Sequence, residues 1–395
     1  MLESVQDTKA LGSMIIARIV YALNWLNVGA IFVLMASDVG AGVSGLGIVS
    51  AAFYLGIGIF QIPGGLLAAK WGPKKVVVLG IFMFSFSVLG TAVSATIPEL
   101  AVLRFIVGAG MAFVFAPGIV IITRLLRGGK SGMGVGLFNS AYDLGGLLAL
   151  SGWIAVAMVT GWRLSLVTSG GLGIITGILT FLFVPGDEVR AEFRISMRPL
   201  LDVLKNKQLI LIGLGTIGFD VGNTIISSFM IYYLVSIKAA SGTVAGLVAS
   251  LVTVVPIFAA LWFGRAYDVI VKHRMIMTLA ILGSAGSLVF GAFPSILAAI
   301  LCSAIGGLVA GVGYTFAFAG ARDLNRAGKE YEGLAISWVN SIHLTGSFLP
   351  PIFFSYIVES LGYSQAWLWS AALTLVFLVP ILLMVERWGT RAASL

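Results

Sequence analysis

Twelve long apolar segments run along this chain, and each is long enough to cross a lipid bilayer as a helix. A spanning helix needs about 20 mostly apolar residues, because each residue adds about 1.5 Å and the hydrocarbon core is about 30 Å thick. We expect the spans at residues 13–36, 45–68, 76–95, 98–125, 131–158, 164–184, 208–235, 242–264, 275–293, 295–320, 332–358 and 365–385. Only 10% of the 395 residues are charged, whereas soluble domains carry about 25%. The chain is therefore predicted to be an all-α integral membrane protein.

Basic residues gather in the connections on one side of the predicted membrane. The longest polar interval, residues 185–207, lies on this side and separates six spans from six. The basic residues on this side are Lys70, Lys74, Lys75, Arg124, Arg127, Lys130, Arg190, Arg194, Arg198, Lys205, Lys207, Lys272, Arg274, Arg322, Arg326 and Lys329, against Arg163 and Lys238 on the other. Cytoplasmic loops are enriched in Lys and Arg, so we expect both termini in the cytoplasm and the protein in the cell (inner) membrane. Topology thus accounts for the net charge of +8, and nucleic-acid binding is not expected.

Short sequence matches relate the two sets of six spans. Residues 21–24, 113–116 and 139–140 match residues 220–223, 316–319 and 340–341, at offsets of 199 to 203 residues. Six helices repeated in parallel are typical of many secondary transporters, whose substrate site lies between the halves near the bilayer midplane. We divide the chain into an N-terminal six-helix bundle (1–184), a cytoplasmic central loop (185–207) and a C-terminal six-helix bundle (208–395).

Polar residues are distributed unevenly among the spans. The third, sixth, ninth and twelfth spans contain no charged residue, Asn or Gln between their ends. We therefore expect these four to face lipid as outer helices, and the other eight to line a polar space.

Asp143, Asp220, His343 and Arg104 are titratable side chains that lie well inside predicted spans. Counting about 1.5 Å per residue places Asp143, Asp220 and His343 near the midplane, and Arg104 about 10 Å in from the external side. An ionised group in the hydrocarbon core costs about 2.5 to 3.5 kcal/mol, so such residues usually have a function. We predict that Asp143 or Asp220 binds and releases a proton, with Arg104 or His343 as partner. The alternative is a fixed Asp143–Arg104 ion pair that only joins the fourth and fifth spans.

Four amides occupy positions related by the repeat. Asn24 corresponds to Asn223, and Asn139 corresponds to Asn340. We predict that they bind a polar solute from both halves; the alternative is hydrogen bonding between helices, worth about 0.6 kcal/mol.

Arg18 lies near the expected cytoplasmic edge, and we interpret it as an anchor whose side chain reaches the interface. Aromatic side chains in the spans are candidates for the walls of a cavity, although such residues more often serve packing. These residues are Tyr21, Trp25, Tyr54, Tyr142 and Tyr314.

The segment after the second span resembles a known signature. Residues 65–75, Gly-Leu-Leu-Ala-Ala-Lys-Trp-Gly-Pro-Lys-Lys, look like motif A of the major facilitator superfamily, with a degenerate copy at residues 264–268. Residues 104–110 resemble motif B of this family. The resemblance implies twelve transmembrane helices in two pseudo-symmetric six-helix bundles, and a gating role on the cytoplasmic side for Gly65, Gly72, Lys74, Arg265 and Asp268.

Two departures from the family pattern bear on function. Ala69 stands where motif A has an aspartate, which implies a weaker cytoplasmic latch in the first half. The fifth span lacks the Gly-Pro pair of motif C that marks many drug:proton antiporters, which disfavours an exporter.

These features together predict a secondary transporter that carries a small polar organic solute by proton symport and rocks one half against the other. A carboxylate bound by Arg104 is one candidate solute. We expect a monomer in the lipid bilayer with no cofactor, no metal and no catalytic site, because no nucleotide-binding loop or metal-ligand cluster is present in the sequence. The alternatives are a proton-driven exporter of cationic or amphipathic compounds and, in a different class, a transporter-like sensor or passive pore.

Overall fold

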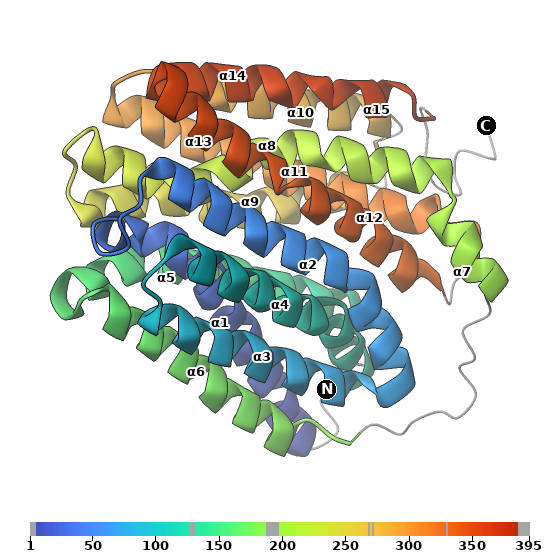
Figure 1. The fold of residues 1–395 in the computed structure, drawn as a ribbon. Coiled ribbons are helices and arrows are strands. Elements are labelled where there is room, and N and C mark those ends of the chain that lie inside the picture. The colour runs from blue at the N-terminus through green and yellow to red at the C-terminus, as the bar shows by residue number, and fades with distance from the viewer. Residues whose placement is uncertain are drawn as a thin grey trace.

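The computed structural model describes residues 5–126, 131–186, 197–267, 269–270, 272–328 and 331–385. Its helices are α1 (Val5–Met35), α2 (Val43–Trp71), α3 (Pro73–Val93), α4 (Ile97–Leu125), α5 (Ser131–Thr160), α6 (Trp162–Phe183), α7 (Met197–Leu204), α8 (Lys207–Ser236), α9 (Gly242–Ala266), α10 (His273–Gly291), α11 (Ile296–Asp323), α12 (Glu332–Gly346), α13 (Leu349–Leu361), α14 (Tyr363–Val376) and α15 (Leu378–Leu382). No strand occurs within these described ranges. In Figure 1, α6 and α14 lie on opposite outer sides of the bundle, and the short α7 lies at one end.

Twelve candidate membrane spans are present among the described residues, as predicted. The eleventh span consists of α12 and α13, and the twelfth of α14 and α15. The largest difference from the predicted boundaries is in α1, which begins at Val5 instead of residue 13. The all-α fold class is therefore confirmed, and the added turns of α1 affect the interpretation of Arg18 below.

Single glycines connect several neighbouring spans. Gly72, Gly161 and Gly362 have φ angles of 91°, 84° and 85° and form the connections α2–α3, α5–α6 and α13–α14. Only glycine adopts such angles without steric cost, because it has no Cβ. This requirement explains Gly72 of the motif A segment.

The eleventh span is interrupted between α12 and α13, at Ser347 and Phe348. Pro350 and Pro351 follow at once and cannot donate backbone hydrogen bonds to the preceding turn. The Ser347 N–H bonds to the His343 carbonyl at 2.8 Å and ends α12. The interruption places the Ser347 side chain in the middle of the bundle.

The two halves pack through α1 against α8, α2 against α12 and α13, and α5 against α9. Glycines allow close backbone approach at this interface: an added Cβ would lie 2.7 Å from Ser227 O at Gly29, and 2.3 Å from Thr345 N at Gly58. We call the end that carries the α1–α2, α8–α9 and α13–α14 connections the far end, and the opposite end, with the basic residues, the basic end. The Ser44 N–H bonds to Glu359 Oε1 across the halves at 3.3 Å, so the far end is closed.

Gly47 offers a test of this closure. A Cβ added at Gly47 would lie 2.1 Å from Ser355 Oγ and 2.8 Å from the Pro351 carbonyl on α13. We expect Gly47→Val to separate α2 from α13 and to expose Ser50, one turn away and only partly exposed here. Maleimide labelling of Ser50→Cys should then be several-fold faster in Gly47→Val than in the parent, while the native Cys302 is buried.

The matched control is Gly171→Val on α6, where an added Cβ meets no atom within 4 Å. Equal labelling rates in Gly47→Val and Gly171→Val would contradict tight packing at the far end.

Candidate functional site

A central cavity of about 370 Å³ lies between the two halves. Its lining residues come from α1, α2, α4 and α5 of the first half and from α8, α9, α11 and α12 of the second. None comes from α3, α6, α10, α14 or α15. The third, sixth, ninth and twelfth spans thus contribute no residue to the cavity, which agrees with the prediction that they are outer helices.

Arg18 is a cavity residue, and its interpretation as an interfacial anchor is wrong. Because α1 begins at Val5, Arg18 lies about 20 Å along the helix. Only 6% of its surface is exposed. Its guanidinium carbon lies 4.4 to 4.9 Å from four ring centres, those of Tyr21, Phe115, Phe138 and Tyr142. Its Nε and Nη1 have no hydrogen-bond partner among the described residues.

Asp143 lines the same cavity from α5. Its side chain is partly exposed, and no hydrogen bond to its carboxylate is found among the described residues. Asn139, one turn earlier on α5, is exposed and also lines the cavity. Asp143 is thus a carboxylate that faces the cavity, as its depth in the span predicted.

Arg104 is not a partner of Asp143, so the alternative of a fixed ion pair between them is wrong. Its Nη1 donates to the Asn24 carbonyl and to Asn27 Oδ1, both at 3.2 Å, and its Nη2 donates to the Trp25 carbonyl at 2.9 Å. Arg104 lines a separate cavity of about 20 Å³ on the far-end side, together with Trp25. Its described hydrogen bonds join α4 to α1.

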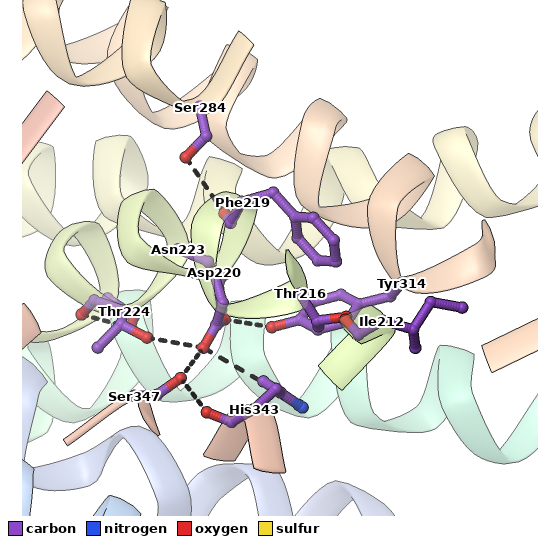
Figure 2. Close-up of polar contacts among 11 residues, drawn as sticks. Ile212, Thr216, Phe219, Asp220, Asn223, Thr224, Ser284, Tyr314, His343 and Ser347 are labelled. Carbon is purple, nitrogen blue, oxygen red and sulfur yellow. Dashed lines mark hydrogen bonds and ion pairs between the residues drawn. The ribbon is translucent and has the colours of Figure 1, made fainter. Parts of the chain in front are cut away.

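Asp220 is the centre of a hydrogen-bond cluster in the second half (Figure 2). Its Oδ1 accepts from the Tyr314 hydroxyl and from Asn223 Nδ2 at 3.1 Å. Its Oδ2 accepts from Ser347 Oγ at 2.5 Å and from Thr224 Oγ1 at 3.1 Å. Four donors therefore satisfy a carboxylate that is only 1% exposed.

His343 belongs to this cluster, as predicted. Its Nε2 lies 3.9 Å from Asp220 Oδ2, and its Nδ1 has no partner among the described residues. Both residues line the central cavity. The structure therefore brings Asp220 and His343 together, whereas Arg104 is near neither carboxylate.

The cluster contains residues that sequence reasoning missed. Thr224 follows Asp220 by four positions, a spacing that places both side chains on one helix face. Ser347 lies at the helix interruption before Pro350, so the proline pair was the available signal. Tyr314 was considered only as part of a wall.

The four amides do not behave alike. Asn139, Asn223 and Asn340 line the central cavity. Asn24 does not: it is fully buried, its Nδ2 donates to the Ser169 carbonyl at 3.2 Å, and its Oδ1 accepts from Ser169 Oγ at 2.9 Å. Asn24 thus joins α1 to α6, which corresponds to the alternative of interhelical hydrogen bonding.

The gating residues implied by motif A are described only in part. A Cβ at Gly65 would meet no atom within 4 Å, and the Lys74 ammonium lies 5.3 Å from the Phe181 ring centre. The side chain of Arg265 and all of Asp268 lie outside the described residues. The gating role of this set stays a prediction.

The two carboxylates should differ in their effect on stability. Asp220→Ala removes the acceptor that four side chains share, and a buried donor left without a partner costs about 1 to 3 kcal/mol. We expect Asp220→Ala to lower the melting temperature in detergent by several degrees, as measured by the fluorescence of the nine tryptophans. Asp143→Ala is the control and should melt close to the parent. Equal melting of the two variants would contradict the assigned hydrogen-bond cluster.

Comparison with known proteins agrees with this architecture. The "Probable sulfoacetate transporter SauU" of Cupriavidus necator is 25% identical over 49% of this chain and 45% of its own length. The "Probable galactarate/D-glucarate transporter GudP" of Escherichia coli is 33% identical over 37% of this chain and 34% of its own. The chain thus aligns with less than half of each of these two relatives. An uncharacterised MFS-type transporter of Methanocaldococcus jannaschii is 24% identical over 91% of this chain and 94% of its own.

The fold has solved counterparts. The crystal structure of a bacterial homologue of the human lysosomal transporter Spinster superposes with a TM-score of 0.73 over 96% of both chains, at 15% identity. The family model of the Major Facilitator Superfamily matches residues 14–219 and 212–393. With this match across both halves, the twelve spans and the central cavity, the chain belongs to the major facilitator superfamily and is a transporter of that type.

Proposed function

We propose that the protein is a secondary active transporter of a small organic anion, driven by proton symport. The observation that carries the proposal is Arg18, which is buried in the central cavity with two nitrogen atoms that have no hydrogen-bond partner among the described residues. A cation inside the membrane is costly, and charge-assisted hydrogen bonds to a carboxylate or sulfonate would offset that cost. Arg18 replaces Arg104 as the proposed anion-binding group, because Arg104 donates to α1.

The named solutes of two relatives support this class of solute. Sulfoacetate carries a sulfonate and a carboxylate, and galactarate and glucarate each carry two carboxylates. Their transporters match only part of this chain, so the solute itself is argued from the cavity.

Asp143 is the proposed proton-coupling residue. It faces the cavity without a hydrogen-bond donor among the described residues, whereas Asp220 is held by four. An anion bound at Arg18 would add negative charge to a cavity that already holds Asp143, so a proton on Asp143 stabilises the loaded state by removing like-charge repulsion. Asp220 and His343 then serve as a second polar site whose contacts join α8, α11 and α12.

The proposed transport cycle uses the two-half architecture. The contacts at Gly47 and Glu359 close the far end, and opening there while the basic end closes would give alternating access. The distribution of the basic residues supports a cytoplasmic location for the basic end and both termini. The proposed form is a monomer in the cell (inner) membrane.

An exporter of cationic or amphipathic compounds is the second candidate function. Asp143 favours it, because a carboxylate that has no hydrogen-bond donor among the described residues and lines a cavity with aromatic rings also suits an organic cation. The same flux assay, with organic cations in the panel, distinguishes the two functions.

Arg18→Gln tests the solute class. In proteoliposomes with an imposed pH gradient, we expect the wild type to accumulate small carboxylates or sulfonates, and Arg18→Gln to reduce the initial rate by at least about tenfold, or about 1.4 kcal/mol. Arg198→Gln, which changes an exposed arginine of α7, is the matched control. Anion uptake by Arg18→Gln at the wild-type rate would overturn the proposal, and uptake of cations alone would favour the exporter.

Asp143→Asn tests the proton coupling. We expect this variant to exchange labelled solute across the membrane but to lose accumulation against a gradient, because the amide cannot carry a proton at neutral pH. Asp202→Asn, an exposed position on α7, is the control and should accumulate solute normally. Gradient-driven accumulation by Asp143→Asn would exclude Asp143 as the coupling residue.

A further inference from the structure

The central cavity is unusually rich in aromatic side chains. The first half contributes Tyr21, Trp25, Tyr54, Phe115 and Tyr142. The second half contributes Tyr314 and Phe318 from α11. Aromatic residues make up 11% of the whole chain, so seven of them around one cavity indicate a lining suited to a particular kind of solute.

Each half contributes one group of rings, and we call these two groups the aromatic walls of the cavity. In the first half, Trp25 packs against Tyr142 at 5.7 Å and against Tyr54 at 6.1 Å between ring centres. In the second half, Tyr314 and Phe318 are stacked at 5.9 Å with 13° between their planes. The nearly parallel rings of Tyr314 and Phe318 both line the cavity from α11.

The ring faces select between types of organic acid. An aromatic solute gains favourable stacked or edge-to-face contacts with such walls. A sugar acid carries several hydroxyl groups, and any of them that met a ring face instead of a polar side chain of the lining would stay unsatisfied, which opposes binding. The walls therefore favour a planar ring over a polyhydroxylated chain.

The polar side chains of the cavity that have no partner among the described residues indicate which substituents an aromatic solute would carry. Arg18 is already surrounded by aromatic rings, and its Nε and Nη1, which have no partner in the described part of the chain, could bind one anionic group. Gln61 lines the same cavity from α2, is fully buried, and has no partner for its amide nitrogen or its amide oxygen among the described residues. A hydroxyl group both donates and accepts, so it is the simplest group that satisfies both atoms of the amide.

We infer that the transported anion is a planar aromatic carboxylate with a hydroxyl group on its ring, the carboxylate on Arg18, the ring between the two aromatic walls and the hydroxyl at Gln61. This inference rests on the proposed function, because it names the anion class for the same cavity.

Binding to the purified full-length protein, measured by isothermal titration calorimetry, tests the inference. The probes are 4-hydroxybenzoate, benzoate, cyclohexanecarboxylate and glucarate. We expect 4-hydroxybenzoate to bind several-fold more tightly than benzoate, cyclohexanecarboxylate to bind at least about tenfold more weakly than benzoate, and glucarate not to bind measurably. Arg18→Gln should lose binding of all the carboxylates.

Gln61→Leu tests the hydroxyl site separately. We expect this variant to bind benzoate like the wild type and to lose the preference for 4-hydroxybenzoate; retained benzoate binding shows that the variant is folded. Gln365→Leu makes the same chemical change at an exposed position at the start of α14, and should keep the preference.

The outcomes separate this inference from the proposed function. If glucarate binds through Arg18 and the aromatic acids do not, the inference is wrong and organic-anion transport stands. Equal affinity for benzoate and cyclohexanecarboxylate would overturn the aromatic selectivity, and an unchanged preference in Gln61→Leu would overturn the hydroxyl site. If no anion binds and none is transported, the proposed function itself fails.

Discussion

Water is missing from the hydrocarbon core of a bilayer, so each polar group in a spanning segment must find its partner within the protein or in a cavity. Serine and threonine in the outer spans meet this demand locally, as when Thr180 Oγ1 donates to the Thr176 carbonyl at 2.8 Å. Side chains with more hydrogen-bonding capacity need partners on other helices. Arg104 finds its partners on α1, and Asp220 finds them on α8, α11 and at the end of α12. Among the described residues, Arg18 and Gln61 are two side chains that keep buried polar atoms without a hydrogen-bond partner and line the central cavity.

Much of this arrangement can be predicted from the sequence, because depth in the membrane follows from counting residues. Counting residues predicted the twelve spans. It gave Asp220 and His343 a similar depth, but it left open which carboxylate meets which partner. The direction in which a side chain points around its helix is harder to predict, and the errors lie there. Asn24 turns toward Ser169 on α6 instead of toward the cavity. Arg18 was misplaced for a different reason: polar residues at the start of α1 hid two further helical turns.

The two halves have diverged in chemistry while keeping one fold. With the offset of 199 residues, the position of Arg18 in the first half corresponds to Ile217 in the second, and with the offset of 201, Asp143 corresponds to Leu344. The first half therefore supplies the charged groups that face the cavity without described hydrogen-bond partners. The second half supplies a carboxylate whose hydrogen bonds connect three of its own helices. The charged side chains of the first half are therefore suited to bind a solute. The hydrogen bonds of Asp220 in the second half instead fix the positions of its own helices.

The single-glycine connections have a mechanical consequence. Helices α2 and α3, α5 and α6, and α13 and α14 are each joined by one residue, which leaves no slack for one helix of a pair to slide along the other. A displacement of one helix of a pair would therefore also displace the other helix. A displacement of about an ångström at the contact between Gly47 and Ser355 would be carried along a helix that is about 40 Å long. In the proposed transport cycle, each pair of helices joined by a single glycine would therefore move as one unit.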